Sequence, residues 1–257
     1  KGLIRESCSS PCEYFCGACG EGEVVLSDVF INSADTSFKI PFKEEKRILL
    51  SYSKTGKAVY ISHISLMTIM ERALLRSQYY TKYSEGYNPK PKLEFAAPLS
   101  VGVASEEEIA AVHIYNFSNS DDFIENMNKG LPKGIRITRA MEIEDPVKKR
   151  KSLMSSFWGS RLELIFYNIP LTFVLKKTGE LPEGLLTDID TIGEQENRLL
   201  LTLKNMGRKE YNLASVLKYL SGSDDYLAEA EIIRKQTLAG DPNEQAKGLP
   251  YFSYYGT

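Results

Sequence analysis

Four cysteines near the start of the chain have the spacing that most directly suggests chemistry. Cys8, Cys12, Cys16 and Cys19 fall within twelve residues, and no other cysteine occurs among the 257 residues. A chain of this length does not need two disulfides to support its core, whereas four thiolates at Cys-x3-Cys-x3-Cys-x2-Cys spacing suit one metal site. We favour structural zinc. An iron–sulfur cluster and unmetallated thiols are the alternatives, because compact runs of four cysteines also bind such clusters.

A second set of residues has the types needed for acid–base chemistry. His63, one of only two histidines, follows Ser62 at the predicted start of a helix, and Lys54 comes shortly before it. Because histidine titrates near neutral pH, His63 is a candidate general base or phosphate contact, although it could simply cap the helix. Lys54 and Glu85 are the other catalytic candidates. The second histidine, His113, lies among apolar residues and is interpreted as structural.

The segment from Tyr83 to Lys92 interleaves aromatic and basic residues around Pro89 and Pro91. Single-stranded nucleic acid sites need stacking surfaces for bases and positive charges for phosphates, which this composition supplies. The alternative is a rigid loop that packs its tyrosines on the neighbouring helix. The predicted substrate-binding residues are Lys54, His63, Tyr83, Tyr87, Asn88, Lys90 and Lys92.

The elements that must position these residues follow a clear order. Alternating apolar residues predict strands at 47–54, 92–99, 107–116 and 135–144, and helical spacing predicts helices at about 62–78 and 121–131. The order β-α-β-β-α-β is that of the ferredoxin-like fold, an antiparallel sheet with two helices on one face. We therefore expect an α+β protein. The predicted core residues of this lobe are Leu49, Leu66, Met70, Leu74, Phe95, Val112 and Ile137.

The domain organisation follows from shifts in composition along the chain. A second, smaller α+β lobe follows the first, and a ferredoxin-like fold is one option for it. The predicted parts are a four-Cys metal-binding segment at 1–22, a linker at 23–46, the ferredoxin-like lobe at 47–145, a basic linker at 146–160, the second lobe at 161–240 and an irregular tail at 241–257.

Composition excludes several classes of function. The 32 basic and 34 acidic residues give a net charge of −2, so nucleic-acid binding has to depend on local patches rather than on bulk charge. The sequence contains no phosphate-binding glycine loop and no Gly-x-Ser-x-Gly motif. No apolar run approaches the roughly 20 residues of a membrane span. We expect a cytoplasmic protein with no membrane partner.

One stretch resembles a known family. Its motifs are Tyr-Ser-Lys-x-Gly at 52–56, Ser-His-x-x-Leu-Met at 62–67, Glu-Arg-Ala at 71–73 and Tyr-Ser-Glu-Gly-Tyr-Asn-Pro-x-Pro-Lys at 83–92. These resemble the radical-SAM-linked domain family of unknown function, which stands beside or behind a radical S-adenosylmethionine (SAM) protein that often carries a cobalamin-binding-like domain. The sequence departs from that family at Lys90, where Arg or His is usual, and in the second lobe, where TDIDTI replaces a basic Asp-x-Arg-Pro stretch.

The resemblance implies a partner as well as a fold. By this resemblance, the segment Cys8–Cys19 is similar to the end of a radical SAM partner. Only that partner is then expected to bind SAM. Our leading hypothesis is a C-terminal recognition module that presents tRNA or rRNA to a radical SAM enzyme. The alternatives are an RNA-processing or RNA-modifying enzyme with His63 as acid or base, and a protein–protein docking domain for the radical SAM barrel. We expect Lys54–Gly56, His63 and Tyr83–Lys92 to share one edge of the first lobe.

Overall fold

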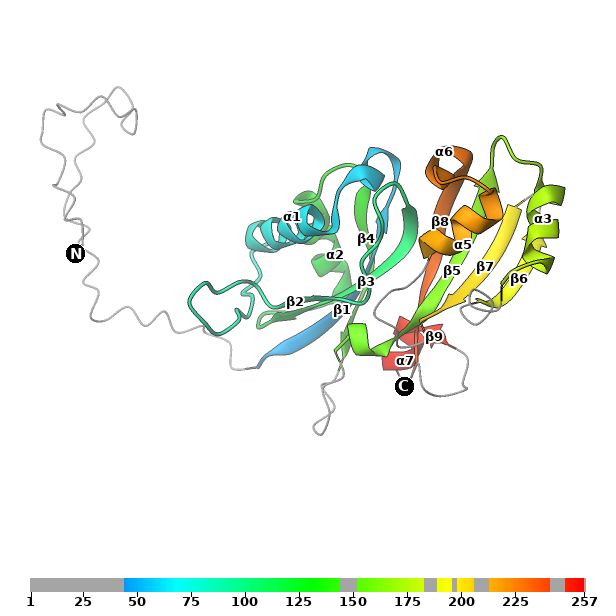
Figure 1. Cartoon of the computed structure of the whole chain (residues 1–257). Coiled ribbons are helices and arrows are strands. Elements are labelled where there is room, and N and C mark those ends of the chain that lie inside the picture. The colour runs from blue at the N-terminus through cyan, green and yellow to red at the C-terminus, as the bar shows by residue number, and fades with distance from the viewer. Residues whose placement is uncertain are drawn as a thin grey trace, which may run out of the picture. The chain divides into compact units, whose positions relative to one another are not determined.

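The computed structural model describes residues 44–143, 152–182, 189–195, 198–205, 213–240 and 248–256, and it is mixed α+β (Figure 1). The predicted four-Cys segment, with Cys8, Cys12, Cys16 and Cys19, lies outside these residues, as do nearly all of the linker at 23–46 and the basic run at 148–151. Both lobes belong to one compact unit, Pro41–Thr257. No helix among the described residues is long and apolar enough to cross a membrane.

The first lobe has the element order that the sequence predicts. Ser62 caps α1, since its side chain accepts a hydrogen bond from the backbone N–H of Ser65. The side chain of Asn119 caps α2 by accepting a hydrogen bond from the backbone N–H of Asp122. The elements are β1 (Lys46–Lys54), the 3-10 helix η1 (Gly56–Tyr60), α1 (His63–Arg76), β2 (Leu93–Phe95), β3 (Ala104–Ile114), α2 (Ser120–Lys129) and β4 (Ile135–Ile143).

The second lobe differs from the prediction at both ends. Strand β5 starts at Phe157, inside the stretch predicted to be a linker up to residue 160, and the predicted irregular tail contains a strand and a helix. The elements are η2 (Met154–Ser156), β5 (Phe157–Phe166), α3 (Leu171–Gly179), β6 (Ile189–Gln195), β7 (Arg198–Lys204), α5 (Leu213–Ser221), α6 (Tyr226–Glu229), β8 (Ala230–Ala239), β9 (Leu249–Pro250) and α7 (Tyr251–Tyr255).

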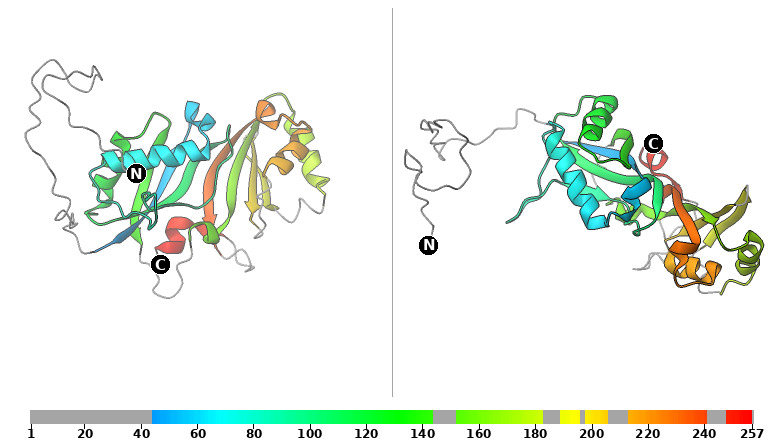
Figure 2. Two further views of the ribbon diagram at one scale, coloured as in Figure 1. Left: turned by 60° about the vertical axis from the view of Figure 1, so that its left-hand side comes forward. Right: turned by 90° about the horizontal axis from the view of Figure 1, so that it is seen from above.

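The described strands form a single sheet in the order β4-β1-β3-β8-β5-β7-β6, with β2 on β3 and β9 on β8. Within the first lobe the antiparallel order is β4-β1-β3-β2, and the second lobe repeats it as β8-β5-β7-β6. Both orders agree with the split βαβ arrangement. The lobes join where β3 and β8 pair in parallel at Ala104–Ile233 and Ser105–Arg234. Figure 2 shows β8 in orange as the strand of the second lobe that lies next to the first.

The two faces of the first lobe's sheet are covered by different parts of the chain. Helices α1 and α2 cover the face that carries Ile48, Leu50 and Tyr52, and the predicted core residues Leu66, Met70, Leu74, Phe95, Val112 and Ile137 are buried there. Leu49 is also buried, but it packs on the opposite face with Tyr251 of α7. A strand alternates its side chains between faces, so Leu49 cannot share a face with its neighbours at 48 and 50. The prediction placed it in the wrong core.

A buried charge cluster and an exposed arm as the candidate functional sites

Two of the predicted site residues lie together at the end of β1. Lys54 is the last residue of the strand and is only 1% exposed. His63 is the first residue of α1 and is half-buried, with its ring edge-on to Phe95 at 5.1 Å between centroids. The turn between them is fixed by Gly134, which has φ +89° and whose carbonyl accepts a hydrogen bond from Thr55. A Cβ at Gly134 would stand 2.4 Å from the Thr55 carbonyl oxygen, so only glycine fits.

Lys54 belongs to a group of titratable side chains near the place where the lobes meet, all buried except the half-buried His63. We call this group the junction cluster: Tyr52, Lys54, His63, Glu108 and Arg234. The register of β1 and β3 places Glu108 opposite Tyr52, and β8 brings Arg234 opposite Ser105. Arg234 donates from Nη1 to both oxygens of Glu108, at 3.0 Å each. The two side chains are 1% and 3% exposed, so this ion pair between lobes is fully buried.

Burial shifts the pKa of four members of the junction cluster. It raises the pKa of Glu108 and, together with the charge of Glu108, the pKa of Tyr52. Burial lowers the pKa of Lys54, and it also lowers the pKa of His63, which the nearby Lys54 charge lowers further. Several shifted groups at one place are typical of a functional site, although buried ion pairs in structural roles shift pKa values as well.

The segment from Lys82 to Lys92, which we call the arm, is held at its base by backbone hydrogen bonds. The Lys82 N–H donates to the His113 carbonyl at 2.8 Å, and the Lys92 N–H donates to the Lys82 carbonyl at 2.7 Å. Further out, Tyr83 and Pro91 pair in an isolated antiparallel β-bridge. All residues from 83 to 90 are exposed, and Tyr87 projects fully into solvent. The arm is thus anchored at the sheet and exposed at its tip.

The arm and the junction cluster lie at opposite ends of the first lobe, so the prediction of one shared edge is wrong. The arm joins β3 at His113, whereas Lys54 pairs with Ser105. Eight residues of strand separate these points by about 27 Å. Helix α1 carries the chain back along the sheet, and Figure 1 shows the arm beyond its C-terminal end. The arm then pairs with itself instead of reaching back, which leaves Glu85 far from His63.

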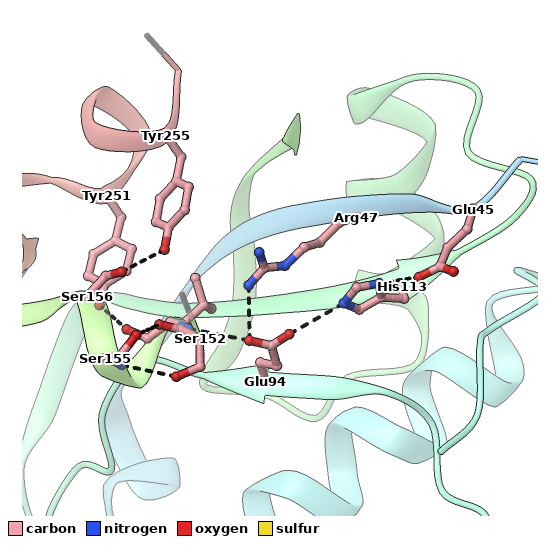
Figure 3. A network of polar contacts seen from close by, with 10 residues as sticks. Glu45, Arg47, Glu94, His113, Ser152, Ser155, Ser156, Tyr251 and Tyr255 are labelled. Carbon is pink, nitrogen blue, oxygen red and sulfur yellow. Dashed lines mark hydrogen bonds and ion pairs between the residues drawn. The ribbon is translucent and has the colours of Figure 1, made fainter. Parts of the chain in front are cut away.

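His113 and two glutamates form a polar network beneath the arm (Figure 3). The Nδ1 atom of His113 lies 2.6 Å from Oε1 of Glu45, and its Nε2 atom lies 3.4 Å from Oε1 of Glu94. Glu94 also accepts a hydrogen bond from Arg47 at 3.0 Å, and Glu45 pairs with Lys82 of the arm. A carboxylate only accepts hydrogen bonds, so the ring donates to both glutamates only when both of its nitrogens are protonated.

The same network reaches the start of the second lobe and the C-terminal helix. The backbone N–H of Leu153 donates to Glu94 at 3.4 Å, and the Leu153 carbonyl accepts from the Tyr251 hydroxyl at 2.7 Å. The hydroxyls of Ser156 and Tyr255 lie 2.9 Å apart. These contacts link the base of the arm to β2, η2 and α7. His113 is therefore buried within a polar network that the sequence does not reveal.

Acid should weaken this network. Burial alone raises the pKa of Glu94, but contacts with His113 and Arg47 outweigh it and hold the pKa below the usual 4.5. The contribution of Glu94 to stability is therefore complete above about pH 4.5 and is lost as the pH falls through the lowered value. We expect the Glu94→Gln variant to lose less unfolding free energy between pH 7 and pH 3 than the wild type. Parallel pH curves from urea unfolding would contradict this role.

Neither cavity described at the surface holds the candidate residues. One, of 390 Å³, lies between α2 and β4 beside Asn128 and Arg136, and another, of 500 Å³, lies where β5 leads into α3 beside Tyr167. Within the described residues, no group of three or more His, Cys, Asp or Glu side chains could hold a metal ion. The predicted cysteine site falls outside those residues.

Glu108, Arg234 and Glu94 are the site residues that sequence reasoning missed. Glu108 and Arg234 stand on strands at positions that alternation assigns to the interior, and a charge at such a position is a usable signal. Alternation places Glu94 on the face of β2 opposite to Leu93 and Phe95, so no such signal marks it. The partners could not be named, because Glu108 and Arg234 are separated by 126 residues of sequence.

Comparison with known proteins identifies the family. Residues 47–244 match the family described as an uncharacterized protein conserved in bacteria (DUF2344). No curated protein matches the chain. The matched region contains both halves of the junction cluster and the whole arm. Since the match spans more than half of the sequence, the chain belongs to the DUF2344 family of bacterial proteins.

Proposed function

We propose that this chain is the C-terminal recognition module of a radical SAM enzyme, and that its arm holds a single-stranded segment of tRNA or rRNA for modification. The observation that carries the proposal is the arm itself. It is ordered by backbone hydrogen bonds at its base and yet exposes Tyr83 and Tyr87. Neither ring belongs to a hydrophobic core among the residues that the structure describes.

The arm has the chemistry that single-stranded RNA requires. Bases stack on exposed aromatic rings with about 1–3 kcal/mol for each base, whatever the sequence. Lys90 is exposed on the same arm and Lys92 is half-buried at its base, and both can contact phosphates. Because the arm is already ordered, binding loses less conformational entropy than it would with a flexible loop.

The radical SAM part of the proposal rests on sequence resemblance. The motifs at 52–56, 62–67, 71–73 and 83–92 resemble a domain found beside radical SAM proteins, and Cys8–Cys19 resembles the end of such a partner. In this proposal the four cysteines bind zinc, or alternatively an iron–sulfur cluster, and SAM belongs to the partner domain. The module presents the RNA and the partner modifies it.

The arrangement of the acid–base candidates favours recognition over catalysis. An enzyme built on His63, Lys54 and Glu85 needs all three at one site, within reach of one substrate. Glu85 lies on the arm, at the opposite end of the sheet from the other two. If RNA does not bind, the remaining hypothesis is a docking domain for the radical SAM barrel.

The charge of Lys90 gives a first test. The Lys90→Ala variant should bind single-stranded RNA more weakly, and its plot of log affinity against log salt should be shallower by about 0.7, the value for one phosphate contact. Lys129→Ala, which removes an exposed lysine from α2, is the matched control and should leave the slope unchanged. Filter binding of the full chain between low and moderate salt measures both. The same slope in all three proteins would exclude the arm as a phosphate-contacting surface.

A further inference from the structure

We propose that the junction cluster forms an oxyanion site, in which Lys54 and the N-terminus of α1 bind a phosphate group. This site lies at the other end of the first lobe from the arm, and it does not depend on the function proposed for the arm.

The junction cluster contains two buried cations, Lys54 and Arg234, and one buried carboxylate, Glu108. Both oxygens of Glu108 accept hydrogen bonds from Arg234. Lys54 is 1% exposed, and it makes no hydrogen bond or ion pair with the part of the chain that the structure describes. Taking an ammonium group out of water is unfavourable unless it is paired. Two cations therefore share one carboxylate, and an anion would complete the balance.

The N-terminus of α1 supplies a second attraction for an anion. The helix has fourteen residues, and its first backbone N–H groups have no acceptor within the helix. The Ser62 side chain accepts only from Ser65, and no first-turn residue is acidic, although acidic residues are favoured there. The half-buried His63 ring stands at this end. Aligned N–H groups at a helix start are a common phosphate-binding device.

Lys54 and the start of α1 lie on the same side of the sheet. Along β1, the residues Ile48, Leu50 and Tyr52 face the helices, and Lys54 continues that alternation. His63 packs on Phe95, which belongs to the same core and contacts Tyr52 edge-on at 6.3 Å. Burial lowers the pKa of His63 and the charge of Lys54 lowers it further, which agrees with the placement of both residues at the same end of the first lobe.

An NMR titration of the amide groups with inorganic phosphate tests the site in the full chain. We expect saturable shifts of the His63, Ile64 and Ser65 amides, with chloride at matched ionic strength causing none. The Lys54→Met variant should weaken the dissociation constant about tenfold or more, whereas Lys129→Met should leave it unchanged. Unsaturable shifts, or equal affinity in Lys54→Met and wild type, would overturn the proposal.

Two further measurements make the outcome decisive. If Lys54→Met does not fold, the wild-type titration still decides, because a site at α1 must shift those three amides and not the α2 amides of Asp121 and Asp122. A single-stranded RNA then distinguishes the sources of the phosphate. Displacement of inorganic phosphate by RNA assigns the site to the nucleic acid backbone, and simultaneous binding assigns it to a free phosphate or small phosphate ester.

Discussion

Replacing Glu108 by Leu should lower the free energy of unfolding by about 3–5 kcal/mol, the usual result of removing one partner from a buried ion pair. The variant leaves Arg234 and Lys54 as buried cations with no carboxylate between them. Arg234→Met should cost a similar amount, because Glu108 then stays buried without its strongest contact. Either change also weakens the junction of β3 and β8, which pair over only two residues.

The double variant separates the charge effect from packing. With both Glu108→Leu and Arg234→Met, neither half of the pair is left buried, so the stability lost through the broken pair should return and only the cost of the uncompensated Lys54 should remain. Lys235→Met is the matched control, because Lys235 is the next residue on β8 and its ion pairs are partly exposed, so its loss should be within about 1 kcal/mol. Urea unfolding at pH 7 compares these four variants with the wild type. If Glu108→Leu and Arg234→Met lose no more unfolding free energy than Lys235→Met, the buried pair does not hold the lobes together.

Removing the Tyr87 ring should reduce RNA-binding free energy by about 1–3 kcal/mol, the range for one base stacked on an aromatic side chain. That range corresponds to roughly 5- to 150-fold in the dissociation constant. Stability should hardly change, because Tyr87 is fully exposed and makes no core contact. The salt slope should also stay the same, since the ring carries no charge, which distinguishes Tyr87→Ala from Lys90→Ala.

A second exposed tyrosine controls for non-specific stacking. Tyr167→Ala removes a ring that is 60% exposed on the second lobe, away from the arm. Its affinity for RNA should equal that of the wild type. Fluorescence anisotropy with a short labelled RNA compares the three proteins. Equal losses in both tyrosine variants would mean that the arm is not a specific binding surface.

Local sequence signals predicted the first lobe well. The helix at α1 follows from apolar spacing and from the cap at Ser62, which the structure confirms. The same signals gave no assignment at β6, because its sequence IDTIGEQ is short and largely polar. Among the described strands, β6 lies at one end of the sheet and pairs with β7 alone. An edge strand needs less apolar surface than a central one, so composition gives little sign of it.

The candidate sites were only partly predictable because they depend on long-range pairing. Lys54 and His63 could be placed together, since a short turn connects them. Arg234 joins them only through the pairing of β8 with β3, which no local pattern specifies. The position of the arm was misjudged because chain length alone permits both a loop that folds back and one that pairs with itself. Here hydrogen bonds between Ser84 and Lys90 select the second arrangement.

Crosslinking in living cells tests the central claim most directly. Ultraviolet light should join RNA to the full chain, and mass spectrometry of the digested complex should locate the attachment in the peptide that contains Tyr83 and Tyr87. Sequencing of the bound RNA should return single-stranded segments of tRNA or rRNA. Crosslinks confined to other regions, or no RNA above the level of a chain with both tyrosines changed to Ala, would contradict an arm that presents RNA.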